Sequence, residues 1–143
     1  MNKENKLVPG LPSGFEDRWG KKLLLKKRLL KAIENNFIKF GAEAIETSTF
    51  EISRNIGSFL AEDDNNPMSD VFSFQDGDES LTARYDLSSP LARFYAQNNQ
   101  ELPSIFKRYQ IQNVFRNEKA GNGRYREFMQ ADFDIVGNVN PAQ

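Results

Sequence analysis

The chain has 143 residues, 38% of them hydrophobic and 27% charged, which is typical of one globular domain and argues against wholesale disorder. It contains no cysteine and no histidine, so disulfides, thiolate nucleophiles, imidazole acid/base catalysis and histidine-based zinc sites are excluded. With a formal net charge of -1 the chain has no overall basic field, and a nucleic-acid partner would need a local patch. Any chemistry must therefore use carboxylates, guanidinium groups, amides and an external metal ion.

The first residues of the chain carry charges that no apolar segment follows, and no apolar run is long enough to span a bilayer. We therefore expect a cytoplasmic protein without a membrane-spanning segment. Glycine and proline within residues 9–14 predict an irregular, extended lead-in to the first regular element.

A long amphipathic helix is expected over residues 16–40, with Gly41 as its stop signal. Its apolar residues recur at spacings of three, four or seven, and they are Trp19, Leu23, Leu30, Ile33 and Phe37. Basic residues lie between the leucines at positions 21–22 and 26–28. Such a run suits a membrane or RNA surface, but a solvated helix face is the simpler interpretation, and we adopt it.

After this helix the pattern changes to short elements. It predicts a strand over residues 44–47 and then a helix that begins near residue 49 or 50 and ends around residue 57. A polar loop is expected over residues 62–67.

A hairpin and a second helix are expected next. The hairpin has two strands and a turn, at residues 71–75, 81–84 and 76–77. Ser88 or Ser89 is expected to cap a helix that holds Pro90 in its first turn and runs to about residue 97. Because the chain shows no internal repeat and no long linker, residues 1–143 are expected to form a single domain.

The last third of the chain predicts two long strands of an antiparallel hairpin. In residues 106–118 polar and apolar side chains alternate, which gives one polar face made of Arg108, Gln110, Gln112, Arg116 and Glu118. A loop over residues 119–124 leads to the second strand, whose corresponding face carries Arg126, Phe128, Gln130, Asp132 and Asp134. We expect this face of the hairpin to be exposed to solvent.

Two interpretations of the polar face remain open. An ordinary solvent-facing sheet carries weak ion pairs and needs no ligand. Solubility alone, however, favours lysine, glutamate and threonine, whereas this face concentrates arginine, glutamine and carboxylates around a single phenylalanine. Guanidinium groups bind phosphate bidentately, an aromatic ring stacks on a planar group, and amides and carboxylates orient an amine. The residue types therefore suit a ligand that has phosphates, a planar ring and an ammonium group.

Several segments of the chain resemble a known family. Residues 114–118, the loop at 123–128 and residues 129–137 resemble motif 2 of class II aminoacyl-tRNA synthetases, in a form similar to that of the histidyl-tRNA synthetases. The resemblance extends upstream to three further segments in the family's order: the amino-acid-binding segment, the dimer-forming motif 1 and the front of the domain, at residues 81–93, 37–51 and 12–17. It therefore covers nearly the whole chain, and it implies an α+β fold in which an antiparallel sheet is flanked by helices.

The resemblance also implies an activity and its partners. A histidyl-tRNA synthetase activates histidine with ATP and Mg²⁺ to histidyl-adenylate and transfers the acyl group to tRNA(His), and the full-length protein is a homodimer. The chain ends at Gln143, before the family's histidine-specific segment, motif 3 and the anticodon-binding domain. We therefore expect it to be the front portion of the catalytic core, truncated and inactive alone.

Site residues follow from the match to the family's motifs. The catalytic pair is Arg116 and Glu118, and the residues expected at ATP are Arg116, Glu118, Arg124, Arg126 and Phe128. The residues expected at histidine are Asp86, Leu87, Ser88, Arg116, Gln130 and Asp134. Arg116 would clamp the α-phosphate and the substrate carboxylate, and Glu118 would face the adenine or help to hold Mg²⁺. Phe128 would stack on adenine.

Two of these residues also have simpler structural interpretations, and the sequence differs from the family's usual motifs at several positions. Phe128 suits simple core packing, and Asp86 suits a helix cap because it lies just before a helix start. The family's motif 1 normally has proline where this chain has Ser48, and many members have glutamate, glycine and threonine in place of Asp86, Leu87 and Ser88. Two further alternatives stay open: a synthetase-like, histidine-sensing regulatory subunit of ATP phosphoribosyltransferase, and a non-catalytic interaction module.

Overall fold

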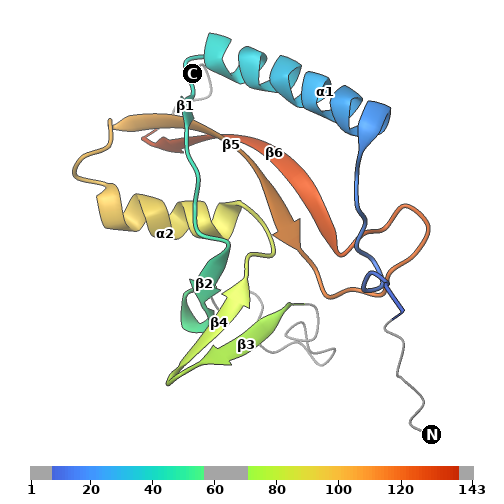
Figure 1. Cartoon of the computed structure of the whole chain (residues 1–143). Coiled ribbons are helices and arrows are strands. Elements are labelled where there is room, and N and C mark those ends of the chain that lie inside the picture. Colours follow the sequence, from blue (N-terminus) through green and yellow to red (C-terminus); the bar gives the residue numbers. More distant parts are fainter. Residues whose placement is uncertain (1–7, 57–70, 139–143) are drawn as a thin grey trace, which may run out of the picture.

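The computed structural model describes residues 8–56 and 71–138. In chain order the elements are α1 (Gly20–Lys39), β1 (Glu43–Ala44), β2 (Phe50–Ile52), the 3-10 helix η1 (Ser53–Asn55), β3 (Ser73–Asp76), β4 (Glu79–Ala83), α2 (Ser88–Asn98), β5 (Ile105–Phe115) and β6 (Glu127–Gly137). The strands of the described residues form two three-stranded sheets, with the orders β1-β5-β6 and β2-β4-β3. Helices flank these sheets (Figure 1), so the expected α+β class is confirmed. One detail differs, because β1 pairs with β5 in parallel and makes the first sheet mixed.

The hairpin of β5 and β6 is the longest antiparallel pairing in the described residues, and its prediction is confirmed. Its register pairs Ile105 with Gly137 at one end and Phe115 with Glu127 at the other. Directly opposite residues of an antiparallel pair share one face of the sheet. The predicted first strand reached residue 118, whereas β5 ends at Phe115, and the last three residues of that prediction lie beyond the sheet.

Helix α1 lies across one face of this hairpin (Figure 1). The ring of Phe37 lies 5.8 Å from that of Tyr109 on β5 and 5.6 Å from that of Phe133 on β6, measured between centroids. Trp19 was expected on the same apolar face but is 78% exposed at the helix start, so that expectation was wrong. No helix among the described residues is long and apolar enough to cross a membrane.

The opposite face of β5 is polar in sequence, yet it is buried. Helix α2 packs there through Phe94, whose ring centroid lies 6.2 Å from that of Phe106. Arg108 and Gln110 on this face have no exposed surface. The predicted solvent-facing surface was therefore wrong at these positions, because α2 and the chain between β1 and β2 cover them and supply partners for their polar groups.

Residues 49–57 were expected to form a helix, and this expectation was wrong. The structure has the strand β2 followed by η1, and Phe50 pairs with Ala83 and Ile52 with Leu81 of β4. The ring of Phe50 also packs edge-on against that of Phe74 at 5.0 Å. Tertiary pairing thus overrides a local helical signal over so few residues. The predicted helix end at residue 57 and the polar loop at 62–67 lie outside the described residues.

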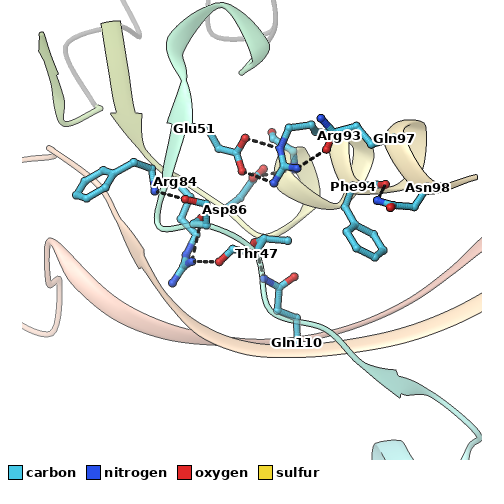
Figure 2. Close-up of polar contacts among 12 residues, drawn as sticks. Thr47, Glu51, Arg84, Asp86, Arg93, Phe94, Gln97, Asn98 and Gln110 are labelled. Atoms are coloured by element: carbon cyan, nitrogen blue, oxygen red, sulfur yellow. Dashed lines mark hydrogen bonds and ion pairs between the residues drawn. The ribbon is translucent and has the colours of Figure 1, made fainter. Parts of the chain in front are cut away.

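The predicted hairpin at residues 71–84 is confirmed as β3 and β4, and the predicted second helix as α2. The expected serine cap was wrong. Leu87 is the N-cap residue, and Oδ1 of Asp86 accepts the N–H of Ser89 at 3.0 Å. Figure 2 shows a second anchor of α2, where Arg93 binds Glu51 of β2 with Nε···Oε2 at 2.6 Å and Nη2···Oε1 at 2.7 Å. This bidentate pair, with Glu51 buried, ties α2 to the second sheet.

Candidate active site

A pocket lies at the turn end of the long hairpin, where β5 ends and β6 begins. Its volume is about 460 Å³, and its lining residues are Arg116, Glu118, Gly123, Arg124, Tyr125 and Phe128. Four of these had been singled out from the sequence as ATP-binding residues: Arg116, Glu118, Arg124 and Phe128. The turn between the strands is closed by a pair of backbone hydrogen bonds between Gly121 and Arg124, at 3.0 and 3.3 Å. The pocket is therefore built from a strand end, a closed turn and the first residues of the returning strand.

Arg116 is held in this pocket by two aromatic rings. Its guanidinium carbon lies 4.3 Å from the centroid of Tyr85 and 5.1 Å from that of Phe128. Its Nε donates to the backbone carbonyl of Tyr85 at 3.4 Å, and its backbone N–H donates to the carbonyl of Arg126 at 2.9 Å. Cation–π contacts on the faces of a guanidinium leave its N–H edge suited to a phosphate or carboxylate.

Glu118 is oriented by the same tyrosine, since the hydroxyl of Tyr85 donates to Oε1 of Glu118 at 3.2 Å. Tyr85 has no role among the site residues expected from the sequence. The sequence indicated a role for Tyr85 only through its position between Arg84 and Asp86, in the segment similar to the family's amino-acid-binding segment. The long sequence separation from Glu118 gave no indication that the two side chains meet.

Arg126 lies in a different environment from Arg116 and Arg124. Its guanidinium lies over the ring of Phe72 at 4.6 Å and that of Phe15 at 6.0 Å, and Nη1 donates to the carbonyl of Ser13 at 3.4 Å. Its backbone N–H donates to the carbonyl of Gly14 at 2.8 Å. A side chain at Gly14 would collide with Arg126, because a Cβ there would lie 2.5 Å from Cγ. Arg126 thus fastens the lead-in segment beside the hairpin loop and does not line the pocket.

A second polar cluster surrounds Arg108, farther along the same face of the hairpin. Arg108 forms an ion pair with Asp134, its cross-strand partner, with Nη2···Oδ2 at 2.5 Å. Burial lowers the pKa of the Arg108 guanidinium, while the nearby carboxylates Asp134, Asp132 and Asp86 oppose this shift. Burial also raises the pKa of the Asp132 carboxyl, against the effect of Arg108. Arg108 therefore forms an ion pair with one carboxylate and interacts electrostatically with two others.

Gln130 lies between this cluster and the pocket. It pairs with Gln112 across the strands, and its Oε1 is buried without a hydrogen-bond partner among the described residues. A buried acceptor that lacks a donor is costly and indicates a site where a ligand or water supplies one. Leu87 has no exposed surface, whereas Ser88 is exposed at the first residue of α2.

A network of amide, hydroxyl and guanidinium groups joins this face to the chain segment that covers it (Figure 2). The side-chain amide of Gln110 donates to Thr47 Oγ1 at 2.8 Å and to Gln112 Oε1 at 2.5 Å. Arg84 is 4% exposed and donates to three backbone carbonyls, those of Asn113 at 2.6 Å, Thr47 at 3.0 Å and Ser48 at 3.1 Å. These contacts fix the chain between β1 and β2 against the end of β5.

The predicted site residues thus share one face of the hairpin but form two groups. The pocket brings together Arg116, Glu118, Arg124 and Phe128. Asp86 and Asp134 belong to the cluster around Arg108. Asp134 is six residues from Phe128 along β6, which corresponds to about 20 Å of strand. Gln130 lies between the two groups, so an elongated ligand would be needed to contact both.

Comparisons with known proteins identify the family of the chain. The family described as "tRNA synthetases class II core domain (F)" matches residues 17–141. A histidine–tRNA ligase of Pelagibacter ubique is 76% identical over 143 residues, and that of Rhodopseudomonas palustris is 43% identical over 141 residues. The chain spans 31% and 27% of the length of these two curated relatives.

Solved structures give the same fold. A histidyl-tRNA synthetase from Nostoc sp. PCC 7120 aligns with a TM-score of 0.76 and 28% identity, over 92% of this chain and 29% of that one. A protein from Bacillus halodurans C, described as an ATP phosphoribosyltransferase regulatory subunit/histidyl-tRNA synthetase, has the same TM-score at 23% identity, over 98% of this chain and 35% of that one. Since the family match extends over residues 17–141, the chain belongs to the class II tRNA synthetase core-domain family.

Proposed function

We propose that the chain is the front portion of the catalytic domain of a histidine–tRNA ligase, which joins histidine to ATP as histidyl-adenylate and then transfers the acyl group to tRNA(His). The observation that carries the proposal is the pocket in which Arg116 is held between two rings beside Glu118 and Arg124. The 76% identity to a histidine–tRNA ligase over the whole chain supports the choice of histidine.

In this proposal ATP binds at the hairpin end. Phe128 is half-buried on the polar face and lines the pocket, which suits stacking on adenine better than simple core packing. Arg116 lies against that ring and would meet the α-phosphate, while Arg124 on the turn would meet the outer phosphates. Arg126, held by Phe15 and Phe72, would act on ATP or on the tRNA acceptor end only after leaving those rings.

Histidine would bind farther along the same face. The unpartnered Oε1 of Gln130 suits the α-ammonium group, with Asp86 and Ser88 as further acceptors and Leu87 contributing only backbone. Asp134 would accept a hydrogen bond from the imidazole while Arg108 holds its other side. This carboxylate is half-buried, and it would discriminate once a bound ligand covers it, because a ligand without the donor leaves the charge incompletely paired.

The reaction requires that histidine and ATP be positioned together and that the charge at the α-phosphate be stabilised. The carboxylate of histidine attacks the α-phosphorus of ATP, the bond to the bridging oxygen breaks, and pyrophosphate leaves with the electron pair. Both reactants are anionic, so a fixed guanidinium at the α-phosphate lowers the repulsion, an effect of about 3 kcal/mol for one well-placed donor. No covalent enzyme intermediate is needed, which accords with a chain that has neither histidine nor cysteine.

Mg²⁺ fits the site through Glu118 and the phosphates of ATP. The described residues contain no group of three or more acidic side chains able to hold a metal ion by themselves. Mg²⁺ in nucleotide sites commonly uses one or two carboxylates together with substrate phosphates. Glu118, whose carboxylate is oriented by Tyr85, would supply that contact, and the ion would neutralise phosphate charge.

The rest of the proposal concerns the whole protein. Residues 1–143 would form part of one catalytic domain that contains motifs 1 and 2, and the remainder of the active site would come from the part of the relatives that this chain does not span. The full-length protein would be a cytoplasmic homodimer. A histidine-sensing regulatory subunit or a non-catalytic module would not need Arg116, Glu118, Arg124 and Phe128 around one pocket, so this grouping favours the ligase.

The test is histidine-dependent exchange of labelled pyrophosphate into ATP by the full-length enzyme that contains this chain. We expect exchange that requires histidine and is not supported by the other amino acids. A protein that binds histidine but exchanges no pyrophosphate would support the sensor instead and contradict the proposal.

A further inference from the structure

We propose that Tyr85 is a positioning residue for adenylate formation, because its single side chain orients both Arg116 and Glu118; this inference rests on the function proposed above. Tyr85 lies between β4 and α2 and has no role in the assignments made from the sequence. Its two ends contact groups of opposite charge, the ring contacting the cation and the hydroxyl contacting the anion.

The ring of Tyr85 and its backbone together restrain Arg116. The guanidinium carbon lies 4.3 Å from the ring centroid, closer than the 5.1 Å to Phe128 on β6. The backbone carbonyl of Tyr85 accepts Nε at 3.4 Å, which fixes the rotation of the guanidinium plane. A guanidinium held on its faces and at Nε keeps its outer N–H groups for an anionic ligand.

The hydroxyl of Tyr85 restrains Glu118. It donates to Oε1 at 3.2 Å and so directs one carboxylate oxygen toward the tyrosine, leaving the other to face a ligand or ion. Arg116 and Glu118 lie just beyond the end of β5, where the strand no longer sets the direction of their side chains. Tyr85 contacts both side chains, and Phe128 of β6 adds a second contact to Arg116.

Hydrogen bonds hold the backbone on both sides of Tyr85. The N–H of the preceding residue, Arg84, donates to the carbonyl of Thr49, and the carbonyl of Arg84 accepts the N–H of Phe115, both at 2.9 Å. On the other side Asp86 caps α2 through Ser89 at 3.0 Å. The support is thus in place before any ligand binds, which is the condition for preorganised catalysis.

The experiment compares Tyr85→Phe and Tyr85→Leu in the full-length enzyme by pyrophosphate exchange and by ATP affinity. Tyr85→Phe keeps the ring and removes only the hydroxyl, so we expect a loss of about tenfold in kcat/KM for ATP. Tyr85→Leu also removes the cation–π contact, and we expect a loss on the order of 10²-fold in kcat. In both variants the KM for histidine should rise less than the KM for ATP, because Gln130 and Asp134 lie farther along β6 and Asp86, although it follows Tyr85 in the chain, is anchored by its own hydrogen bond from Ser89.

Tyr109→Phe is the matched control. Tyr109 also donates its hydroxyl to a glutamate at 3.2 Å, Oε1 of Glu34, but it lies on the opposite face of the hairpin under α1. We expect this variant to retain wild-type exchange. A second comparison uses Glu118→Ala: the effect of Tyr85→Phe on ATP affinity should disappear in that background if the hydroxyl acts through Glu118.

The outcomes separate the two proposals. If the wild-type enzyme shows no histidine-dependent exchange, the proposed function fails. If the wild type exchanges normally while both Tyr85 variants behave like Tyr109→Phe, the function stands and the positioning role is wrong. An equal rise in the KM values for ATP and histidine, or an undiminished Tyr85→Phe effect beside Glu118→Ala, would show general structural damage and would also overturn the positioning role.

Discussion

The carboxylate of Asp86 lies at the junction of a helix start and the polar cluster. Its Oδ1 accepts the N–H of Ser89 in α2, and its charge acts on Arg108. Both interpretations of this residue, the helix cap and the ligand contact, are therefore compatible with its position. One oxygen serves the backbone, and the other remains for an ammonium group.

Asp86→Asn separates these two roles. Asparagine caps helices about as well as aspartate, so the melting temperature should stay close to that of the wild type. The neutral amide does not balance an ammonium charge, and we expect the KM for histidine to rise about tenfold or more in the full-length enzyme. Unchanged KM with lowered stability would assign Asp86 to the cap alone.

Asp132 gives a pH dependence of stability. Burial raises the pKa of its carboxyl, with Arg108 opposing and Asp134 and Asp86 adding to the shift. A carboxyl whose pKa is higher in the folded state stabilises the fold below its unfolded pKa, here 3.8, and this contribution is lost as the pH rises through the folded value. Asp132→Asn should therefore raise the free energy of unfolding at neutral pH, and the difference should vanish near pH 3.8. Urea titrations at several pH values measure this, and a destabilised variant at pH 7 would contradict it.

At the scale of elements, the long hairpin carries the site and was the most predictable part of the chain. Polar and apolar residues alternate over the middle of each eleven-residue strand, and this alternation specifies a strand and its two faces. The two-residue and three-residue strands β1 and β2 are too short for such a signal, and the pairing of β2 with β4 decided its structure. The covering of the polar face by α2 was not predictable, because alternation shows that two faces differ but not which one is buried.

Gly137 is needed where the hairpin meets Ser104. Its φ is +127°, and a Cβ there would lie 2.1 Å from the carbonyl oxygen of Ser104. Gly137→Ala should destabilise the chain by about 3 kcal/mol, because backbone must move to admit the methyl group. Gly121→Ala, which would place its Cβ in open space, should stay within about 0.5 kcal/mol of the wild type. Denaturant unfolding compares the two, and equal stabilities would show that the hairpin end is not constrained in this way.

At the scale of the whole molecule, Arg84 joins the two sheets. It follows β4 of one sheet and donates to the carbonyl of Asn113 in β5 of the other, and it also binds the carbonyls of Thr47 and Ser48. Burial lowers the pKa of its guanidinium, with the carboxylates of Glu46 and Glu51 opposing. This side chain and the backbone hydrogen bond from the N–H of Phe115 to the carbonyl of Arg84 thus hold the two sheets together beside Tyr85.

Arg84→Met should therefore cost about 3 kcal/mol of folding free energy, since three buried carbonyls lose their donor. Arg54→Met is a suitable control, because Arg54 forms an exposed ion pair with Glu79 and its loss should cost less than about 0.5 kcal/mol. Chemical denaturation measures both. A methionine variant as stable as the control would show that the sheets are joined without this arginine.

The candidate site was predictable only in part. Motif 2 residues close in sequence, such as Arg116 and Phe128, could be grouped from their resemblance to the family and from strand parity. Contacts between distant segments could not, which is why Tyr85 was missed and why Arg126 was grouped with residues that it does not join. Side-chain direction outside the sheet depends on packing, and local sequence does not encode that packing.

The central claim is that Arg116 acts on ATP at the end of the hairpin, and it is tested most directly by Arg116→Ala in the full-length enzyme. The measured quantity is the rate of histidine-dependent pyrophosphate exchange, with ATP and histidine affinities measured on the same preparation. We predict a loss of at least about 10²-fold in exchange in a folded protein that still binds histidine. Near-normal exchange by Arg116→Ala would contradict the account.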